Sequence, residues 1–277
     1  STGTLAIAAA RQVLEKTGAS ADELDLIICT TITPELTCPS TACLVHDALG
    51  CKDIPAFDIA AACSGFVYGL SVAEKFIRCG DHKKVLVIGA DAMSRTADYT
   101  DRGTCILFGD GAGAAILEPA PTPDRGIQYV TIHVDGSGWD LIHVPAGGSR
   151  LPASHETVDQ RLHYTQMRGR EVYKFAVEKM QWLMGNCMDA CGLTPDDIDL
   201  VVPHQVNMRI IDSAAQRFGF PREKLFVNIE KYGNTSAASV PIALAEAMDI
   251  GKIKEGTTVM LVAFGAGLTW AGAILKF

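Results

Sequence analysis

Gly18-Ala-Ser-Ala-Asp-Glu-Leu-Asp-Leu-Ile-Ile-Cys-Thr30 aligns without a gap with Gly192-Leu-Thr-Pro-Asp-Asp-Ile-Asp-Leu-Val-Val-Pro-His204. Each stretch leaves a helical pattern at a glycine, passes an acidic turn and enters an apolar run of the kind found in strands buried on both faces. The same unit therefore occurs twice, and the sequence predicts a duplicated fold.

The repetition continues more loosely on both sides of these strands. Ala56-Phe-Asp-Ile59 and Phe226-Val-Asn-Ile229 each precede a Gly or Ser turn and a helix, and Val85–Gly89 and Val259–Ala263 are further apolar strands. Strands that alternate with helices indicate two βαβ-type halves related by a pseudo-twofold axis. We expect an α/β protein with five layers, α/β/α/β/α.

The boundaries of the halves follow from composition. We predict an N-terminal half over residues 1–120, a connector or cap over residues 121–165, and a C-terminal half over residues 166–277. The connector is richer in Pro, Gly and His and has weak periodicity, which is typical of a segment that covers one side of a cleft.

Composition limits the class of protein. The 277 residues are 48% hydrophobic and include 26 glycines, as in a compact α/β enzyme. The net charge of −8 argues against a nucleic-acid partner, and no apolar run is long enough for a membrane span. Nine scattered cysteines favour a reducing, cytoplasmic location. Cys187 and Cys191 lack the further ligands of a zinc site, so we expect helix packing there and no metal.

Cys63 differs from the other cysteines in its position. It stands in Phe57-Asp-Ile-Ala-Ala-Ala-Cys63-Ser-Gly-Phe66, just before a helical pattern that runs to Ile77. The positive end of a helix dipole favours thiolate over thiol, so we expect Cys63 to be more nucleophilic than the others. The alternative is that Cys63 is a small buried hydrophobe.

The duplication predicts which residues meet Cys63. His204 ends a strand of the second half, and Asn234 occupies the turn equivalent to that of Cys63. Turns at the carboxyl ends of strands converge near the axis that relates the halves. Taken singly, His204 is equally compatible with a core histidine and Asn234 with a helix cap.

Four separated motifs together resemble one known family. Ala61-Ala-Cys-Ser-Gly65, Pro203–Asn207, Gly233–Pro241 and Phe264–Trp270 are similar to motifs of β-ketoacyl-acyl carrier protein synthase III, of the thiolase superfamily. The resemblance implies a thiolase-like fold and an acyltransferase that starts fatty acid synthesis. Such an enzyme joins an acyl-CoA primer to malonyl-acyl carrier protein and needs no cofactor.

The resemblance also implies the roles of the catalytic residues. Cys63 would carry the acyl group, and His204 and Asn234 would donate hydrogen bonds to the enolate formed by decarboxylation. Backbone N–H groups of Cys63 and of the turn Gly265-Ala266-Gly267 would stabilise the second anion, while Phe264 would exclude water.

Binding residues are implied in the same way. Matched positions for coenzyme A are Arg102, Gly169, Tyr173 and Asn207, and Arg102 is equally compatible with an ion pair to Asp98 or Asp101. Candidates for docking the acidic carrier protein, or simply for a solvated helix face, are Lys174, Arg209 and Arg217. A homodimer is expected.

The sequence departs from the family pattern at three places. The family's first segment, about fifty residues, is absent, and it ordinarily supplies a strand of the first sheet and a coenzyme-gripping aromatic and arginine pair. Cys38 stands where relatives have a larger residue that closes the partner's acyl pocket, so we expect longer primers to be tolerated. Ala266 replaces a glycine, which is acceptable unless its φ is positive.

The motif Gly109-Asp-Gly-Ala-Gly113 has the wrong spacing for dinucleotide binding. We interpret it as a tight strand bend with a structural Asp110.

Other functions share part of this pattern. A ketosynthase that primes polyketide or quinolone-type products would differ in pocket shape only, and an inactive acyl-binding paralogue would keep the motifs. Thiolases proper use His and Cys for proton transfer in the second half, rather than the Asn expected in decarboxylating enzymes. A Cys-His-Asn hydrolase would need a histidine that deprotonates the thiol, and its fold lacks the duplication.

Overall fold

The computed structural model describes all residues, 1–277. The helices are α1 (Thr2–Thr17), α2 (Thr41–Leu49), α3 (Gly65–Arg78), α4 (His155–Asp159), α5 (Gly169–Cys191), α6 (Met208–Phe218), α7 (Ile229–Tyr232) and α8 (Ser239–Asp249). The strands are β1 (Leu26–Thr30), β2 (Ala56–Ile59), β3 (Val85–Ala92), β4 (Asp110–Leu117), β5 (Gly126–Val134), β6 (Ile142–His143), β7 (Gln166–Met167), β8 (Leu200–Pro203), β9 (Thr258–Gly265) and β10 (Thr269–Lys276). Short 3₁₀ turns, η2 (Ala62–Ser64) and η7 (Ser236–Ala238), precede α3 and α8.

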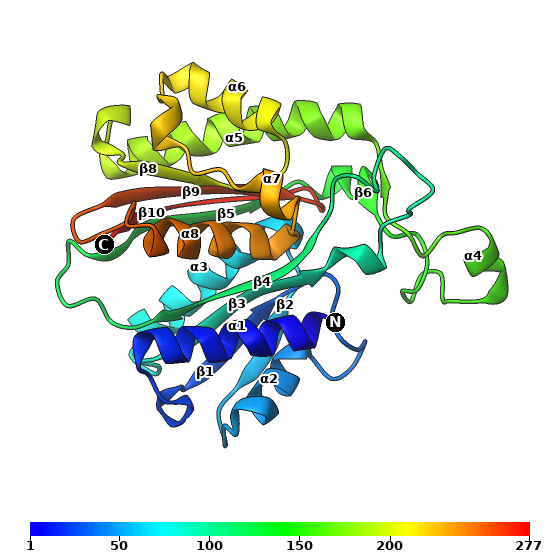
Figure 1. Cartoon of the computed structure of the whole chain (residues 1–277), viewed down its shortest axis with the longest axis horizontal. Helices are drawn as coiled ribbons and strands as arrows, with labels where there is room; N and C mark the ends of the chain where they lie inside the picture. Colours follow the sequence, from blue (N-terminus) through cyan, green and yellow to red (C-terminus); the bar gives the residue numbers. More distant parts are fainter.

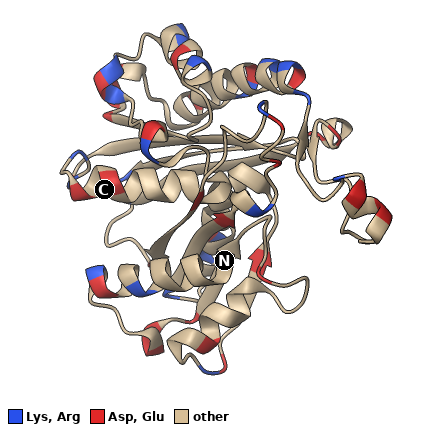
Figure 2. Cartoon of the chain, turned by 45° about the vertical axis from the view of Figure 1, so that its right-hand side comes forward, with Lys and Arg blue, Asp and Glu red and all other residues tan.

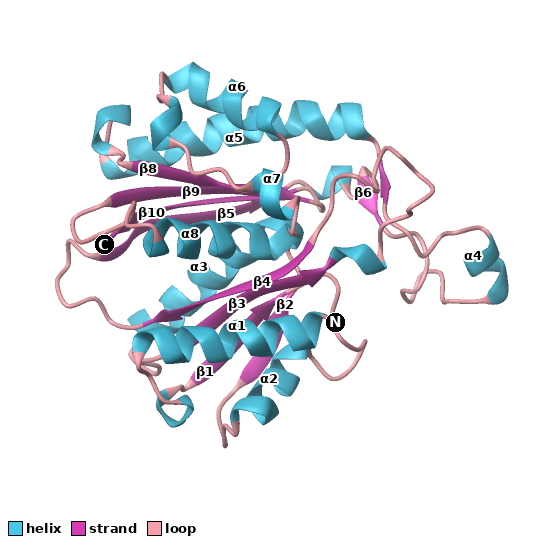
Figure 3. Cartoon of the chain, viewed as in Figure 1, coloured by secondary structure: helices cyan, strands magenta, loops and turns pink.

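The expected five layers are present (Figures 1 and 3). Helices α1 and α2 cover the outer face of the first sheet, α3 and α8 lie between the two sheets, and α5 and α6 cover the outer face of the second sheet. The first sheet has the order β2-β1-β3-β4 and the second has the order β5-β10-β9-β8. The α/β/α/β/α prediction is therefore confirmed.

Strand register relates the two halves residue by residue. Leu26 of β1 pairs in parallel with Val85 of β3, and Leu200 of β8 pairs in parallel with Val259 of β9. The next strand, β4 or β10, is antiparallel to its neighbour in both sheets. Because the pairing is the same, β1 and β3 are the counterparts of β8 and β9.

The predicted strand at 226–229 is wrong. Only an isolated bridge joins Leu225 to β8, and α7 already begins at Ile229. The side chain of Gln205 takes the place of a strand partner: its Nε2 donates to the Phe226 carbonyl at 3.1 Å, and its Oε1 accepts from Asn228 N at 3.0 Å. A side chain thus satisfies backbone groups that a ladder would otherwise pair.

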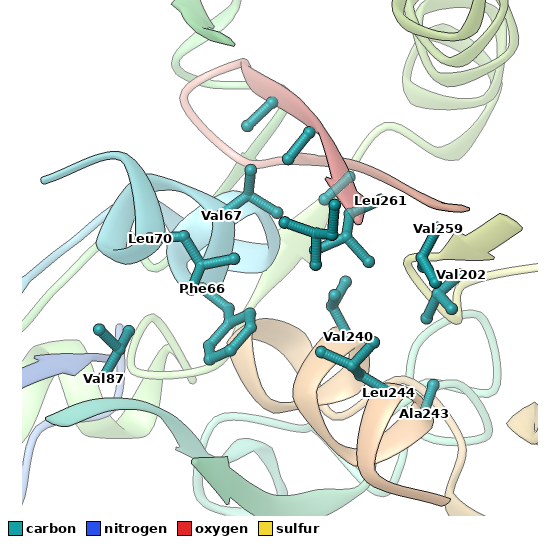
Figure 4. Close-up of a cluster of buried hydrophobic side chains, with 14 of the residues drawn as sticks. Phe66, Val67, Leu70, Val87, Val202, Val240, Ala243, Leu244, Val259 and Leu261 are labelled. Carbon is teal, nitrogen blue, oxygen red and sulfur yellow. The ribbon is translucent and has the colours of Figure 1, made fainter. Parts of the chain in front are cut away.

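Apolar side chains of α3 and α8 fill the space between the sheets (Figure 4). Phe66 and Val67 of α3 are fully buried, and they share one cluster with Val240 of α8, Val87 of the first sheet and Leu261 of the second. Burying a side chain of this size contributes about 1.5–3 kcal/mol. The two central helices therefore fix the distance between the sheets, and with it the loops that follow their strands.

The predicted bend at Gly109–Gly113 is wrong, because residues 110–113 begin β4, which pairs with β3 in one uninterrupted register. A Cβ at Gly109 would lie 2.1 Å from the Tyr232 carbonyl oxygen, and one at Gly113 would lie 2.9 Å from Pro241. The glycines are therefore needed for close approach of the second half. The structural role of Asp110 fits its contacts, because it accepts hydrogen bonds from the backbone and hydroxyl of Ser94 at 2.7 and 2.6 Å.

The two sheets end differently at one edge. In the second sheet β5 covers the outer edge of β10, whereas in the first sheet no strand pairs with the outer edge of β4. Strand β5 also falls inside the range predicted as connector, so part of that range belongs to a sheet. The boundaries at residues 120 and 166 stay a prediction.

Charged residues lie mainly on the outer helices and connecting loops, while the sheets and the inner faces of the central helices carry few (Figure 2). None of the helices combines the length and apolar character that a membrane crossing requires.

Candidate active site

A cavity of about 350 Å³ lies where strands of both sheets end. Cys63 lines it from the turn after β2, His204 from the end of β8, and Asn234 from the turn before η7. The structure thus brings together the three residues that the duplication predicted to meet. Its other lining residues are mostly apolar and comprise Ile32, Ala62, Met93, Leu107, Phe108, Ile142, His143, Val144, Thr165, Met167, Gly169, Val172, Tyr173, Val206, Asn207, Ile210, Phe264, Gly265 and Ala266.

Cys63 is the central residue of η2, directly before α3. The preceding Ala62 has a φ of 48°, in the left-handed region, and Ser236 has a φ of 53° at the equivalent place before α8. Such a conformation is uncommon for residues other than glycine. In both halves a sharp turn therefore places a side chain at the start of a central helix.

The expectation that its helix start favours the thiolate and makes Cys63 more nucleophilic than the other cysteines is wrong for the free protein. Burial raises the pKa of the Cys63 thiol to about 12 and outweighs hydrogen bonds from Ser236 and Asn234 that lower it. The Sγ atom lies 3.7 Å from Ser236 Oγ. The free energy of removing a thiolate from water is larger than the stabilisation that the start of one helix provides. Cys63 is therefore present as the thiol.

One ring nitrogen of His204 contacts a serine hydroxyl, and the other has no partner in the protein. Its Nδ1 lies 2.5 Å from Ser239 Oγ, which also accepts a hydrogen bond from Gln205 N at 3.4 Å. The hydroxyl has one proton to give, and when it donates to Nδ1 the ring proton is on Nε2. The buried Nε2 has no protein partner. Burial lowers the pKa of His204 to about 3, so the ring is neutral.

Asn234 is fixed by the first half of the chain. Its N–H donates to the Leu107 carbonyl at 2.8 Å, and its own carbonyl accepts from Gly109 N at 2.9 Å. Its side-chain Oδ1 accepts from Ser236 N at 2.9 Å. Since Oδ1 faces this backbone donor, the Nδ2 group is the one available to the cavity.

The end of β9 lies against the backbone N–H group of Cys63. A Cβ at Gly265 would lie 2.6 Å from Cys63 N, so a side chain there would block this N–H group. No side chain accepts a hydrogen bond from Cys63 N. Ala266 lines the cavity without a positive φ, whereas Gly267 has a φ of 131° and lies outside the lining. The Phe264 ring stands edge-on to His204, with centroids 5.6 Å apart.

The connector closes one side of the cavity. Ile142 and His143 of β6 line it, next to Met167 of β7, which directly follows the connector. The segment is tied to the first half by Arg161, whose Nε donates to Asp98 at 2.9 Å and which holds the pKa of that carboxyl well below its usual range. Asp98 is therefore the partner of Arg161 and not of Arg102.

The remaining predicted contacts divide into two groups. Gly169, Tyr173 and Asn207 line the cavity, and Asn207 also caps α6 by accepting from Arg209 N at 2.9 Å. The second group is exposed and outside the lining, and it consists of Arg102, Cys38, Lys174, Arg209 and Arg217.

Sequence reasoning missed the residues that contact the three candidate catalytic side chains. Ser236 and Ser239 lie inside the quoted stretch Gly233–Pro241, yet their roles depend on contacts with Cys63 and His204 that only the folded chain creates. The sequence offered one signal for them: this stretch is the counterpart of the turn around Cys63 in the first half.

A second cavity, of about 630 Å³, follows the open edge of β4. It includes Val13, Leu117 and Phe277 but none of the three catalytic candidates. The unpartnered Nε2 of His204 faces the smaller cavity, which also holds Cys63 and Asn234.

Comparison with known proteins supports the same reading. Residues 57–136 match the family 3-oxoacyl-[acyl-carrier-protein (ACP)] synthase III, and residues 188–277 match its C-terminal family. The chain is 48% identical to a β-ketoacyl-[acyl-carrier-protein] synthase III of Caldanaerobacter subterraneus over 100% of the chain and 83% of that protein. It is 49% identical to the one of Clostridioides difficile, over 100% of the chain and 84% of that protein.

A solved structure agrees with these matches. The 3-oxoacyl-[acyl-carrier-protein] synthase III of Aquifex aeolicus superposes with a TM-score of 0.91 at 43% identity, covering 100% of this chain and 85% of that one. At this level of identity over the full chain, the likeness extends beyond the fold. The chain belongs to the 3-oxoacyl-[acyl-carrier-protein] synthase III family of condensing acyltransferases.

Proposed function

We propose that this chain joins an acyl-CoA primer to malonyl-acyl carrier protein through an acyl group carried on Cys63, giving a 3-oxoacyl-acyl carrier protein. The observation that carries the proposal is the unpartnered Nε2 of His204, beside Cys63 and the Asn234 amide in one cavity. The site is built for an anion, and both donors are neutral.

In the first step the Cys63 sulfur attacks the primer's thioester carbon. The carbon–sulfur bond to coenzyme A breaks, and the thiol proton leaves with the departing coenzyme A sulfur. The oxyanion that forms in between lies within reach of backbone N–H groups of Cys63 and of the turn after Gly265, where no Cβ intrudes.

In the second step the malonyl thioester loses carbon dioxide, and its electrons move onto the thioester oxygen. His204 and Asn234 donate to that oxygen, and each such donor is worth about 3 kcal/mol. The enolate carbon attacks the acyl group, and the Cys63 sulfur leaves and takes up a proton. Phe264 covers His204 and limits access of water to the carbanion.

The neutral histidine separates this proposal from a hydrolase. A Cys-His hydrolase needs an imidazole that takes the thiol proton, whereas burial lowers the pKa of His204 to about 3. The family assignment likewise favours fatty acid initiation over the priming of polyketide or quinolone-type products.

In this proposal coenzyme A and the carrier protein reach the cavity through the same opening, near Tyr173 and Asn207. Tyr173 lines the cavity, and the exposed Lys174 follows it on α5, while Arg209 follows the lining residue Asn207 on α6. Arg217 lies eight residues further along α6, roughly 12 Å away. Arg102 is assigned to the phosphates of coenzyme A, since no acidic side chain pairs with it.

The proposal extends to a cytoplasmic homodimer. Cys38 is exposed in one protomer, which suits a residue that reaches a partner's acyl pocket. A Cys38→Phe variant should then prefer shorter primers, and an unchanged chain-length profile would refute this assignment.

Asn234→Ala tests the decarboxylation step. Release of carbon dioxide from malonyl-acyl carrier protein should fall at least about a hundredfold, while acylation of Cys63 by acetyl-CoA continues. Equal loss of both reactions would show that Asn234 serves the fold and not the enolate.

A further inference from the structure

Asp91 is a fully buried carboxylate near the end of β3. Its Oδ1 accepts hydrogen bonds from Thr31 Oγ1 at 2.9 Å, Ile32 N at 2.9 Å, Thr33 N at 3.1 Å and Thr33 Oγ1 at 2.9 Å. Its Oδ2 accepts from Ala237 N, in the other half, at 3.1 Å. A buried charge is tolerated only with such partners, and backbone N–H groups can only donate, so Asp91 is ionised.

The register shows what Asp91 corresponds to in the other half. Val85 and Val259 are equivalent, and Asp91 and Gly265 lie the same number of residues beyond them. Cys63 and Ala237 are likewise the second residues of η2 and η7. The contact between Asp91 and Ala237 N is therefore the counterpart of the contact between Gly265 and Cys63 N.

The two equivalent turns are used differently. In the second half the N–H of Ala237 is occupied by a carboxylate of the protein itself. In the first half glycine replaces that carboxylate, and the N–H of Cys63 is left for the reaction. The duplication thus made two anion-binding turns, of which one is permanently filled.

Asp91 also connects to the cavity through one residue. Burial raises the pKa of Asp91, and the Ser236 side chain is among the groups that lower it. The Cys63 sulfur lies 3.7 Å from that hydroxyl oxygen. Since Ser236 N also holds Asn234 Oδ1, a shift of this turn moves both the amide and the environment of the sulfur.

We propose that Asp91 is a positioning residue that fills the second half's copy of the anion-binding turn and so fixes Ser236 and Asn234 against Cys63. The inference rests on the proposed role of Cys63. The titratable groups that face the sulfur are the Asp91 carboxylate from β3 and the neutral His204 ring at the end of β8.

Two substitutions should move the reactivity of Cys63 in opposite directions. Asp91→Asn removes a negative charge that raises the pKa of the Cys63 thiol, whereas Ser236→Ala removes a hydrogen bond that lowers it. At pH 8 we expect iodoacetamide to alkylate Cys63 about threefold faster in Asp91→Asn and about threefold slower in Ser236→Ala. Peptide mass mapping separates Cys63 from the other cysteines.

Turnover should fall in both variants because Asn234 loses its fixed position. We expect kcat for condensation to drop at least about tenfold, with KM for acetyl-CoA within about twofold. The control is Asp25→Asn, since Asp25 also accepts from backbone N–H groups, of Lys83 and Lys84, but at the far end of the same strands. Both readouts should stay at the parent values in that variant.

The outcomes distinguish a failure of Cys63 as the nucleophile from a failure of Asp91 as its positioning residue. If Cys63 of the parent is neither alkylated nor acylated, the proposed nucleophile is wrong. If it reacts, but Asp91→Asn and Ser236→Ala keep the parent's alkylation rate and kcat, Asp91 is structural only. Should Asp91→Asn fail to fold, the slower alkylation in Ser236→Ala supports the inference, and an unchanged or faster rate overturns it.

Discussion

His204 Nδ1 lies 2.5 Å from Ser239 Oγ, and this contact determines which ring nitrogen faces the cavity. The hydroxyl comes from the first residue of α8, in the segment that begins with Asn234 and passes through η7. One continuous segment therefore supplies Asn234 and orients His204, the two proposed enolate donors, and Ser239 itself lies outside the cavity lining.

Ser239→Ala should lower the rate of decarboxylation about tenfold, because a lost hydrogen bond of about 1–1.5 kcal/mol frees the ring and its tautomer. Acyl transfer to Cys63 should be unaffected. Steady-state release of carbon dioxide measures the first rate and intact mass the second. A rate equal to the parent's would show that packing alone positions His204.

The neutral His204 gives the fold a pH dependence. Burial lowers its pKa from 6.5 to about 3, so between these values the unfolded chain binds more protons and stability falls as the pH falls. Between pH 7 and pH 5 this group should cost about 2 kcal/mol of unfolding free energy.

Urea unfolding of the parent and of His204→Gln at both pH values measures this cost. The variant should lose about 2 kcal/mol less than the parent over the same interval. Identical losses would mean that His204 takes up a proton between pH 7 and pH 5 in the folded protein as well, against the neutral ring assigned to it.

Gly265→Ala should reduce acylation of Cys63 at least about a hundredfold, because its Cβ would lie 2.6 Å from Cys63 N and displace the oxyanion donor. Gly136→Ala is the matched control, since a Cβ at Gly136 meets nothing within 4 Å. Acylation is followed by intact mass at early times. A fully active Gly265→Ala would remove the backbone N–H of Cys63 from the mechanism.

Charge reversal at the mouth of the cavity should weaken the carrier protein selectively. Lys174→Glu and Arg209→Glu should each raise KM for malonyl-acyl carrier protein several-fold, more at low salt, and leave KM for acetyl-CoA unchanged. Lys83→Glu, exposed at the far end of β3, is the control. If both KM values rise together, the substitutions disturb the fold and do not act on docking of the carrier protein.

Much of the site could be predicted because it follows from repetition. Once Gly18–Thr30 and Gly192–His204 are superposed, the carboxyl ends of equivalent strands must face each other across the axis, which places His204 beside Cys63. The structure confirmed the five layers and brought Asn234 to the same cavity.

What could not be predicted depends on contacts across the fold. Gln205 replaces a strand partner of Phe226, which erased the expected strand there, and nothing in the local pattern signals this. The thiol of Cys63 is less acidic than its place at a helix start suggests, because burial is a property of the whole packing. The glycines at 109–113 gain their meaning only from the turn of the other half.

The central claim is that Cys63 carries the acyl group, and the most direct measurement is the intact mass of the protein after incubation with acetyl-CoA. The parent should gain the mass of one acetyl group, located on the peptide that contains Cys63, and lose it on addition of malonyl-acyl carrier protein. Cys63→Ala should gain nothing. Acetylation of the parent at another residue, or undiminished acetylation of Cys63→Ala, would contradict the account.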